Sequence, residues 1–176
     1  MILSQVVFRF LRKEDLPALE WDGEYKHFRR LYVDIYQSMC YGKALMWVAD
    51  LPEIGIIGQL FVQLISGRTE LADGAVRAYV YGFRLKPDYR RKGVGKRMLL
   101  EVENDLDKRS FQYVTLNVAQ DNPQARQFYE RLGYHLVADD PGRWSYLDHL
   151  GIRQEVCEPA WRLEKMLEAE PVRVNI

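Results

Sequence analysis

The chain has 176 residues and a mass of 20.8 kDa, which fits one domain over residues 1–176. Its 25 basic and 25 acidic residues give a formal net charge of zero, which argues against a globally basic nucleic-acid-binding protein and against an acidic disordered tail. Hydrophobic residues make up 48% and charged residues 28%, so a low-complexity disordered chain is excluded and one buried core is expected.

The N-terminal half of the chain alternates strand-like runs with two helical segments. Runs rich in β-branched and aromatic residues predict strands. They cover residues 6–11, 45–49, 56–64 and 76–85. Acidic residues and a proline within residues 14–17 begin a short helix, because a first turn favours them. Apolar residues at helical spacing predict a second helix over residues 25–41, which Gly42 ends.

The C-terminal half begins with a helix that is predicted from just after Asp88 to Leu106. A strand follows over residues 111–118. A fourth helix over residues 122–132 is well delimited, because Asn is a favoured N-cap, Pro a favoured first residue and Gly a favoured stop. Short strand-like pieces lead to a last strand over residues 160–166. The order βααβββαβαββ predicts an α/β fold with a mixed sheet, in which the third helix joins two parallel strands.

The cysteines and the N-terminus predict a reduced, cytoplasmic setting. Cys40 and Cys157 are far apart and lack the spacing of a zinc site or a disulfide framework, so we expect no bound metal. Residues 1–11 lack the basic start and the cleavage site of a signal peptide. No apolar run approaches the ~18 residues that a membrane span needs, so we expect no membrane partner.

A basic, glycine-bearing segment lies where a strand ends and a helix begins. Helix N-termini carry partial positive charge and normally collect acids, yet residues 90–97 contain five basic residues and no acid. Gly93 and Gly95 remove side chains that would keep a phosphate from the backbone N–H groups. Their spacing fits neither a P-loop nor the dinucleotide fingerprint, whose third small residue is replaced by Met98. The segment predicts a phosphate-binding turn, with a solvated basic helix start as the alternative.

A second polar group lies downstream. Asn117 is near the end of a predicted strand, Asn122 caps the next helix, and Tyr129 follows two turns later. Taken singly, Asn122 is explained as an N-cap and Tyr129 as a half-buried core residue. Their order and separation from the glycine turn favour a functional site.

Together the two segments resemble the GCN5-related N-acetyltransferase (GNAT) superfamily. Arg90-x-x-Gly93-x-Gly95 is similar to its (Q/R)-x-x-G-x-(G/A) loop. Leu116-Asn117-Val118, followed by Asn122, Ala125, Tyr129 and Gly133-Tyr134, resembles its next motif. The resemblance implies a GNAT-type mixed, strongly twisted β-sheet that is flanked by helices and splayed between strands 4 and 5. It also implies that acetyl-CoA, the cosubstrate, binds in the split.

The same resemblance implies roles for individual residues. The backbone of Phe83, Arg84 and Leu85 would bind the pantetheine arm. The pyrophosphate would lie against the turn formed by Arg90, Arg91, Lys92, Gly93, Val94, Gly95 and Lys96. Asn117 and Asn122 would complete the acetyl-CoA site. Tyr129 would also be the catalytic general acid near the thioester sulfur, since a tyrosine pKa of about 10 keeps it protonated at neutral pH.

Asn117 departs from the pattern of the ribosomal-protein N-terminal acetyltransferases, where this position is usually an acid that serves as general base. Asparagine cannot accept a proton in that way. Either another group acts through water, or the amine arrives neutral. Candidate bases are Glu70, Asp73, Asp50, His149 and Glu155, which the sequence does not rank.

The implied reaction is acetyl transfer to a primary amine by direct attack within a ternary complex. The acceptor is expected to be a small-molecule amine, a peptide N-terminus or a lysine. The acidic and aromatic residues 21–25 suit a cationic amine, with a solvated turn around a core Trp as the alternative. Trp144, Tyr146 and Trp161 either line the same cleft or fill the core. The oligomeric state is left open between monomer and homodimer.

Two other functions remain to be weighed. One is an acyl-CoA sensor module without turnover, which Asn117 favours and Tyr129 disfavours. The other is a nucleic-acid binder that uses residues 84–97 as a basic stripe. Zero net charge and the glycine spacing count against it, so no nucleic-acid partner is expected.

Overall fold

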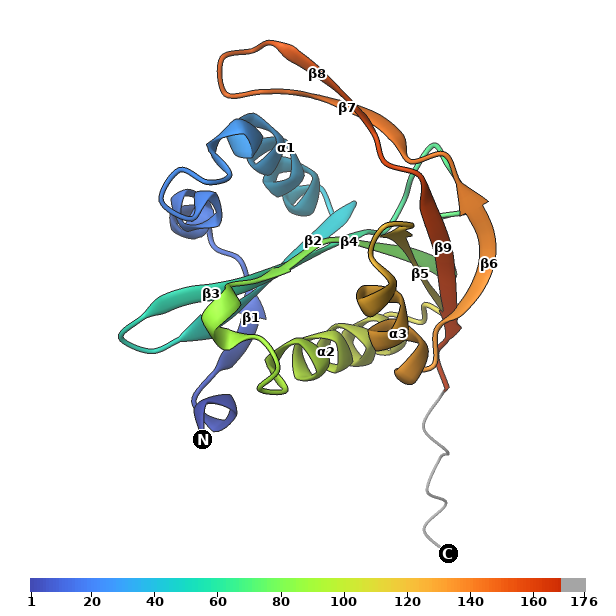
Figure 1. Cartoon of the computed structure of the whole chain (residues 1–176), viewed down its shortest axis with the longest axis horizontal. Coiled ribbons are helices and arrows are strands. Elements are labelled where there is room, and N and C mark those ends of the chain that lie inside the picture. Colours follow the sequence, from blue (N-terminus) through green and yellow to red (C-terminus); the bar gives the residue numbers. More distant parts are fainter. Residues whose placement is uncertain (169–176) are drawn as a thin grey trace, which may run out of the picture.

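A seven-stranded mixed sheet forms the centre of the fold in the computed structural model, which describes residues 1–168 (Figure 1). The strands lie in the order β1-β2-β3-β4-β5-β9-β6. Their bounds are Val7–Phe10 for β1, Ala44–Leu51 for β2, Gly55–Gln63 for β3, Arg77–Leu85 for β4, Tyr113–Ala119 for β5, His135–Asp140 for β6 and Ala160–Met166 for β9. Residues 169–176 of the predicted domain lie outside the described residues.

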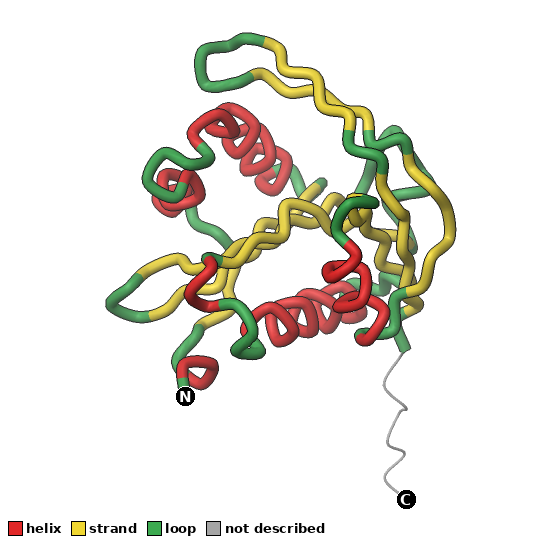
Figure 2. Tube along the Cα trace, in the orientation of Figure 1, coloured by secondary structure: helices red, strands yellow, loops and turns green. Residues whose placement is uncertain are grey.

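Helices cover both faces of this sheet (Figure 2). The α-helices are α1 over Arg29–Cys40, α2 over Val94–Lys108 and α3 over Pro123–Arg131. The 3₁₀ helices are η1 over Ile2–Ser4, η2 over Lys13–Glu20, η3 over Lys26–Phe28 and η4 over Pro87–Tyr89. Helix α1 and η2 lie on one face, and α2 and α3 lie on the other (Figure 1). A separate hairpin of β7, Arg143–Leu147, and β8, Arg153–Cys157, extends past α1.

The pairing confirms the predicted mixed sheet. Strands β4 and β5 are parallel, and α2 makes the crossover between them. Every other neighbouring pair in the sheet is antiparallel. The short strand-like pieces predicted near the C-terminus are three strands, β6, β7 and β8, ahead of β9, where the predicted order counted only one.

Two predicted helix starts are wrong. The helix expected just after Asp88 begins at Val94, because Arg91 and Gly93 have φ angles of 58° and 81°, which no α-helix accommodates. The helix expected from residue 25 begins at Arg29, after the η3 turn. The short helix predicted from residue 14 is 3₁₀ in geometry throughout and contains Pro17. Residues 90–93 therefore form a loop.

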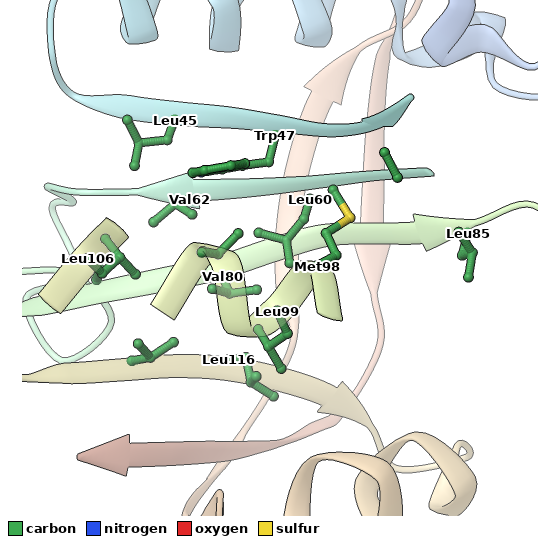
Figure 3. Packing of buried hydrophobic residues seen from close by; sticks show 14 of the residues in the cluster. Leu45, Trp47, Leu60, Val62, Val80, Leu85, Met98, Leu99, Leu106 and Leu116 are labelled. Atoms are coloured by element: carbon green, nitrogen blue, oxygen red, sulfur yellow. The ribbon is translucent and has the colours of Figure 1, made fainter. Parts of the chain in front are cut away.

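The core has two layers, one on each face of the sheet. Side chains alternate along β2, so that Leu45 and Trp47 face α2, while Met46 and Val48 face α1. On the α2 side, residues of β2, β3, β4 and β5 pack against Met98, Leu99 and Leu106 (Figure 3). Each fully buried aliphatic side chain contributes about 1.5–3 kcal/mol to stability. Strands β4 and β5 are thereby held between packed layers at the point where they separate.

Candidate active site

The parallel strands β4 and β5 separate within the sheet. Residues 77–80 of β4 pair with residues 113–116 of β5, and the last pair is Val80 with Leu116. A cavity of about 280 Å³ lies where the strands part, which confirms the predicted splay. It is lined by residues 80–84 of β4, by residues 116–118 of β5, and by Asn122, Ala125 and Tyr129 of α3 and its cap.

A bulge in β4 creates much of this geometry. Gln59 pairs with Arg84 and Phe61 with Tyr81, so Gly82 and Phe83 together face a single residue of β3. Gly82 has a φ of 60°, and a Cβ there would lie 2.6 Å from the Phe61 ring. Only glycine fits at this position. The extra residue of the bulge lacks a ladder partner, so backbone polar groups of β4 are available at the cavity.

Two of the three predicted pantetheine-binding residues at the end of β4 line the cavity, and the third does not. Phe83 and Arg84 line the cavity. Leu85 does not, because its side chain is buried on the α2 side and its carbonyl accepts a hydrogen bond from Arg90 Nε at 2.8 Å. Arg90 therefore ties the loop to the strand end.

The glycine turn begins α2 with free backbone donors. The first intrahelical bond runs from the Arg97 N–H to the Gly93 carbonyl at 3.0 Å, so the N–H groups of Val94, Gly95 and Lys96 lack an acceptor in the helix. No side chain caps this end, and its first turn contains no acid. This arrangement can bind an anion.

The turn also lies beside the split. A Cβ at Gly95 would lie 3.6 Å from the Phe83 ring and 4.0 Å from the Phe128 ring, which is ordinary contact. Helix α2 thus starts against both the β4 bulge and α3. The side chains of Arg91, Lys92 and Lys96 are exposed and form no ion pair with any of residues 1–168, whereas Arg97 pairs with Glu101 at 2.6 Å.

Tyr129 of α3 and Asn122, the N-cap of this helix, line the cavity opposite β4. The Asn122 side chain accepts a hydrogen bond from the Ala125 N–H at 3.1 Å, so its N-cap role is confirmed. Tyr129 packs edge-on against Phe128 and Tyr134, with ring centroids 5.1 and 5.7 Å apart. Burial, with a smaller contribution from Tyr79, raises the pKa of Tyr129 above its ordinary value. Its hydroxyl therefore stays protonated and can donate a hydrogen bond into the cavity.

Asn117 is oriented by an acid that the sequence analysis missed. Burial alone would raise the pKa of Asp140, but Arg68, the Gly142 N–H and the Asn117 side chain lower it below its ordinary value. Because a carboxylate accepts hydrogen bonds, the amide NH₂ of Asn117 faces Asp140. Its Oδ1 is buried and has no partner among the described residues. The Asp-Pro-Gly sequence at 140–142 signals a turn, but nothing in it indicates contact with β5.

None of the five candidate bases lines the cavity. Asp50 pairs with Arg9, Glu70 with Arg68, and Glu155 with Arg153, while Asp73 accepts three backbone N–H bonds in a turn and His149 follows β7. Among residues 1–168, no carboxylate or imidazole lines the split. Tyr81, Tyr129 and Arg84 are its titratable side chains.

Aromatic residues gather on the α1 side of the split. The Tyr25 ring lies under the Arg84 guanidinium, and Trp144 and Tyr146 of β7 pack on Phe28, with centroids 6.2 and 4.9 Å apart. Trp161 instead lies on β9 beneath Arg126. Neither tryptophan lines the cavity: Trp161 packs against the core on the α2 side, whereas Trp144 is exposed and belongs to neither core layer.

A larger cavity of about 450 Å³ lies between η2 and α1. Glu20 and Arg29 line it and form an ion pair at 2.7 Å, so their charges offset each other. Asp22 and Gly23, from the segment 21–25 that is expected to suit a cationic amine, also line it, but no predicted acetyl-CoA-binding residue does. Tyr32 lines this cavity and also accepts a hydrogen bond from Arg84, which links the two regions.

Residues 1–168 contain neither a metal-ligating cluster nor a membrane-spanning helix. No group of three His, Cys, Asp or Glu side chains is placed to hold a metal ion there. In the same part of the chain, no helix is long and apolar enough to cross a membrane.

Sequence comparison connects this geometry to known proteins. N-alpha-acetyltransferase 50 of Danio rerio is 24% identical over 131 residues, which cover 70% of this chain and 78% of that protein. Among solved structures, the ribosomal-protein-S18-alanine N-acetyltransferase from Escherichia coli is 18% identical with a TM-score of 0.67, covering 97% of this chain and 99% of that chain. The PaiA N-acetyltransferase from Thermoplasma acidophilum, solved in complex with coenzyme A, is 21% identical with a TM-score of 0.66, covering 92% and 98%.

These structural likenesses agree with the observed fold. The family model described as acetyltransferase (GNAT) family matches residues 13–134, a span that contains η2, α1, the separating strands, the glycine turn and α3. This span is more than half of the chain. The protein therefore belongs to the GNAT acetyltransferase family.

Proposed function

We propose that the protein is an acetyl-CoA-dependent N-acetyltransferase that transfers the acetyl group to a primary amine by direct attack in a ternary complex. The observation that carries the proposal is the cavity between the separated ends of β4 and β5, with the open N-terminus of α2 beside it. The N-terminus of α2 suits a phosphate, and the cavity suits a small polar reaction centre. Acetyl-CoA has its phosphates and its thioester at opposite ends of a long arm.

The residues present fit acetyl-CoA. Three free backbone N–H groups at Val94, Gly95 and Lys96, with exposed cationic side chains around them, suit the pyrophosphate. The bulged backbone at Gly82 and Phe83 lines the cavity and suits the amide groups of pantetheine. The neighbour from Thermoplasma acidophilum, whose fold is similar, was solved with coenzyme A.

Tyr129 is assigned to the leaving group. Bound acetyl-CoA would supply a thioester, whose C–S bond breaks as the amine nitrogen forms a new bond to the carbonyl carbon. The Tyr129 hydroxyl has no hydrogen-bond partner among the described side chains, and it donates first a hydrogen bond and then its proton to the departing sulfur. The proton lost by the nitrogen passes to water, from which the tyrosine is reprotonated.

Asn117 is assigned to the amine. Asn117 lines the same cavity and its buried Oδ1 is an acceptor without a donor, so an N–H of the bound acceptor satisfies it. Because this oxygen cannot take a proton, the amine reacts from its neutral form. Asn117 thus orients the nucleophile without activating it.

Thiol release from acetyl-CoA, measured across amines, amino acids and peptide N-termini, tests the proposal. We expect amine-dependent release of CoA and a product acetylated on nitrogen. Acetyl-CoA binding without release for any acceptor, including with longer acyl-CoAs, would contradict catalysis and leave an acyl-CoA-binding sensor. Salt-dependent binding to DNA or RNA would instead support the basic-stripe alternative. The cytoplasmic location, the single domain and the choice between monomer and homodimer stay predictions.

A further inference from the structure

Arg84 is held in one orientation by three aromatic residues. Its guanidinium carbon lies 4.0 Å from the centroid of the Tyr25 ring and 5.1 Å from that of Phe28. Its Nη1 donates a hydrogen bond to the hydroxyl of buried Tyr32 at 2.9 Å. A guanidinium stacked and tethered in this way loses little further freedom when it binds a planar anion.

The charge of Arg84 is not balanced by the protein. No carboxylate within residues 1–168 pairs with it, and the residue opposite it on β3 is the neutral, fully buried Gln59. The cavity that Arg84 lines contains no acidic side chain from the described residues. A partly buried cation without a counter-charge favours an anionic ligand.

The aromatic cluster also does not offer a cage for a substrate cation. Tyr25 and Phe28 already bind the guanidinium of Arg84, and neither ring lines the cavity. Trp144 and Tyr146 pack against Phe28, which they help to fix. Tyr25, one of the acidic and aromatic residues 21–25 that are expected to suit a cationic amine, is therefore occupied by Arg84, whereas Asp22 of the same segment lines the larger cavity beside α1.

We infer that Arg84 binds a carboxylate of the acceptor, so that the acceptor is an amine carrying a carboxylate close to the reacting nitrogen. This inference rests on the proposed acetyl transfer and names its substrate class. The carboxylate binds the free N–H groups of Arg84, while the amine faces Asn117 and Tyr129 in the same cavity. A free amino acid and a peptide N-terminus with a nearby acidic side chain present the same chemistry.

Matched acceptors test the inference. Each pair differs only in a carboxylate or its carboxamide: an amino acid with its amide, and a peptide with Asp or Asn at its second position. We expect the wild-type protein to favour the carboxylate member by about tenfold or more in kcat/KM, mainly through KM. The pair with the larger preference identifies the source of the carboxylate.

Substitutions of Arg84 test whether this residue causes the preference for carboxylate acceptors. Arg84→Gln should remove most of it, and Arg84→Lys should retain a part, because lysine keeps the charge but loses the planar fork. Arg109→Gln, the same change at the C-cap of α2 and outside the cavity, should leave the preference unchanged. If Arg84→Gln fails to fold, the Lys variant still tests whether the preference requires the planar guanidinium or only a positive charge.

Two results separate this inference from the proposed function. Acetylation that favours carboxamides or polyamines, with no dependence on Arg84, would overturn the inference and leave the acetyltransferase in place. Absence of any acetylation would overturn the proposed function. In that case, calorimetric titration of the carboxylate acceptors in the presence of CoA still tests Arg84, because binding that is lost in Arg84→Gln supports it and equal binding refutes it.

Discussion

Val80 and Leu116 form the last parallel pair between β4 and β5, although β4 continues to Leu85 and β5 to Ala119. Up to this pair the strands share a hydrogen-bond ladder. Beyond it, the bulge at Gly82 and the divergence of the strands leave backbone groups at a cavity instead of at a partner strand. Because backbone donors and acceptors require partners, this opening is suited to a ligand that supplies them. The proposed reaction centre lies at this opening.

The glycine turn can be tested by adding charge without harming the helix. Gly95→Glu places a carboxylate in the first turn of α2, where it interacts favourably with the helix dipole, so the apo fold should stay stable. The same carboxylate repels a pyrophosphate. We expect the rise in melting temperature caused by CoA to be lost in Gly95→Glu and kept largely in Gly95→Ala, whose Cβ makes only ordinary contacts. A full thermal shift in the Glu variant would contradict the anion site.

Tyr129→Phe removes one oxygen and keeps the ring that packs on Phe128 and Tyr134. If the hydroxyl protonates the sulfur, kcat should fall by about 10²–10⁴-fold, while the affinity for CoA changes little. The measurement is kcat on the best acceptor, alongside CoA affinity and melting temperature. A decrease of less than about threefold in a folded variant would remove the acid role. A large decrease together with lost CoA binding would make Tyr129 a binding residue.

The pH dependence of the rate should follow the acceptor. With no carboxylate or imidazole among the described residues of the cavity, the rate at sub-saturating acceptor should rise with pH toward the pKa of the amine. The pKa of Tyr129 is raised, so its acidic form persists and causes no falling limb below about pH 10. Asn117→Ala should leave the shape of this profile unchanged. Two acceptors of different pKa decide the matter, since an identical limb near pH 7 for both would reveal a base in the enzyme.

Gly82→Ala tests the bulge. The new methyl group would contact the Phe61 ring at 2.6 Å and would stand at a φ of 60°. We expect a loss of about 2–5 kcal/mol in the free energy of unfolding, the sum of a positive-φ penalty and overpacking. Gly67→Ala is the matched control, because nothing lies within 4 Å of its Cβ position and its φ is not positive. Equal stabilities of the two variants would show that the bulge relaxes without cost.

Much of the fold could be predicted from the sequence because its signals are local. Alternating and helical apolar patterns located β1 to β5, α1 and α3, and the Asn-Pro start and Gly stop delimited α3 closely. The predicted start of α2 is several residues too early. Arg91 adopts a positive φ there, and this conformation cannot be predicted from its residue type. The bulge in β4 depends on the register of β3 with β4, and this register cannot be predicted from the sequence of either strand alone.

The candidate site was predictable only in part. The glycine turn, Asn117 and Tyr129 belong to short motifs whose spacing carries information. The stacking of Arg84 on Tyr25 joins residues far apart in the chain, and so does the approach of Asp140 to Asn117. Such contacts depend on how β7 and the start of α1 pack over β4. These contacts can be identified only from the three-dimensional arrangement of the elements.

The most direct test of the central claim is the stoichiometry of the reaction. Acetyl-CoA and a carboxylate-bearing amine are incubated with wild-type protein and with Tyr129→Phe, and CoA thiol and N-acetylated product are both quantified by mass spectrometry. Acetyl transfer in the cavity between β4 and β5 predicts one acetylated nitrogen for each CoA released, at a rate that falls steeply in Tyr129→Phe. CoA release without acetylated amine, or equal rates in the two proteins, would contradict it.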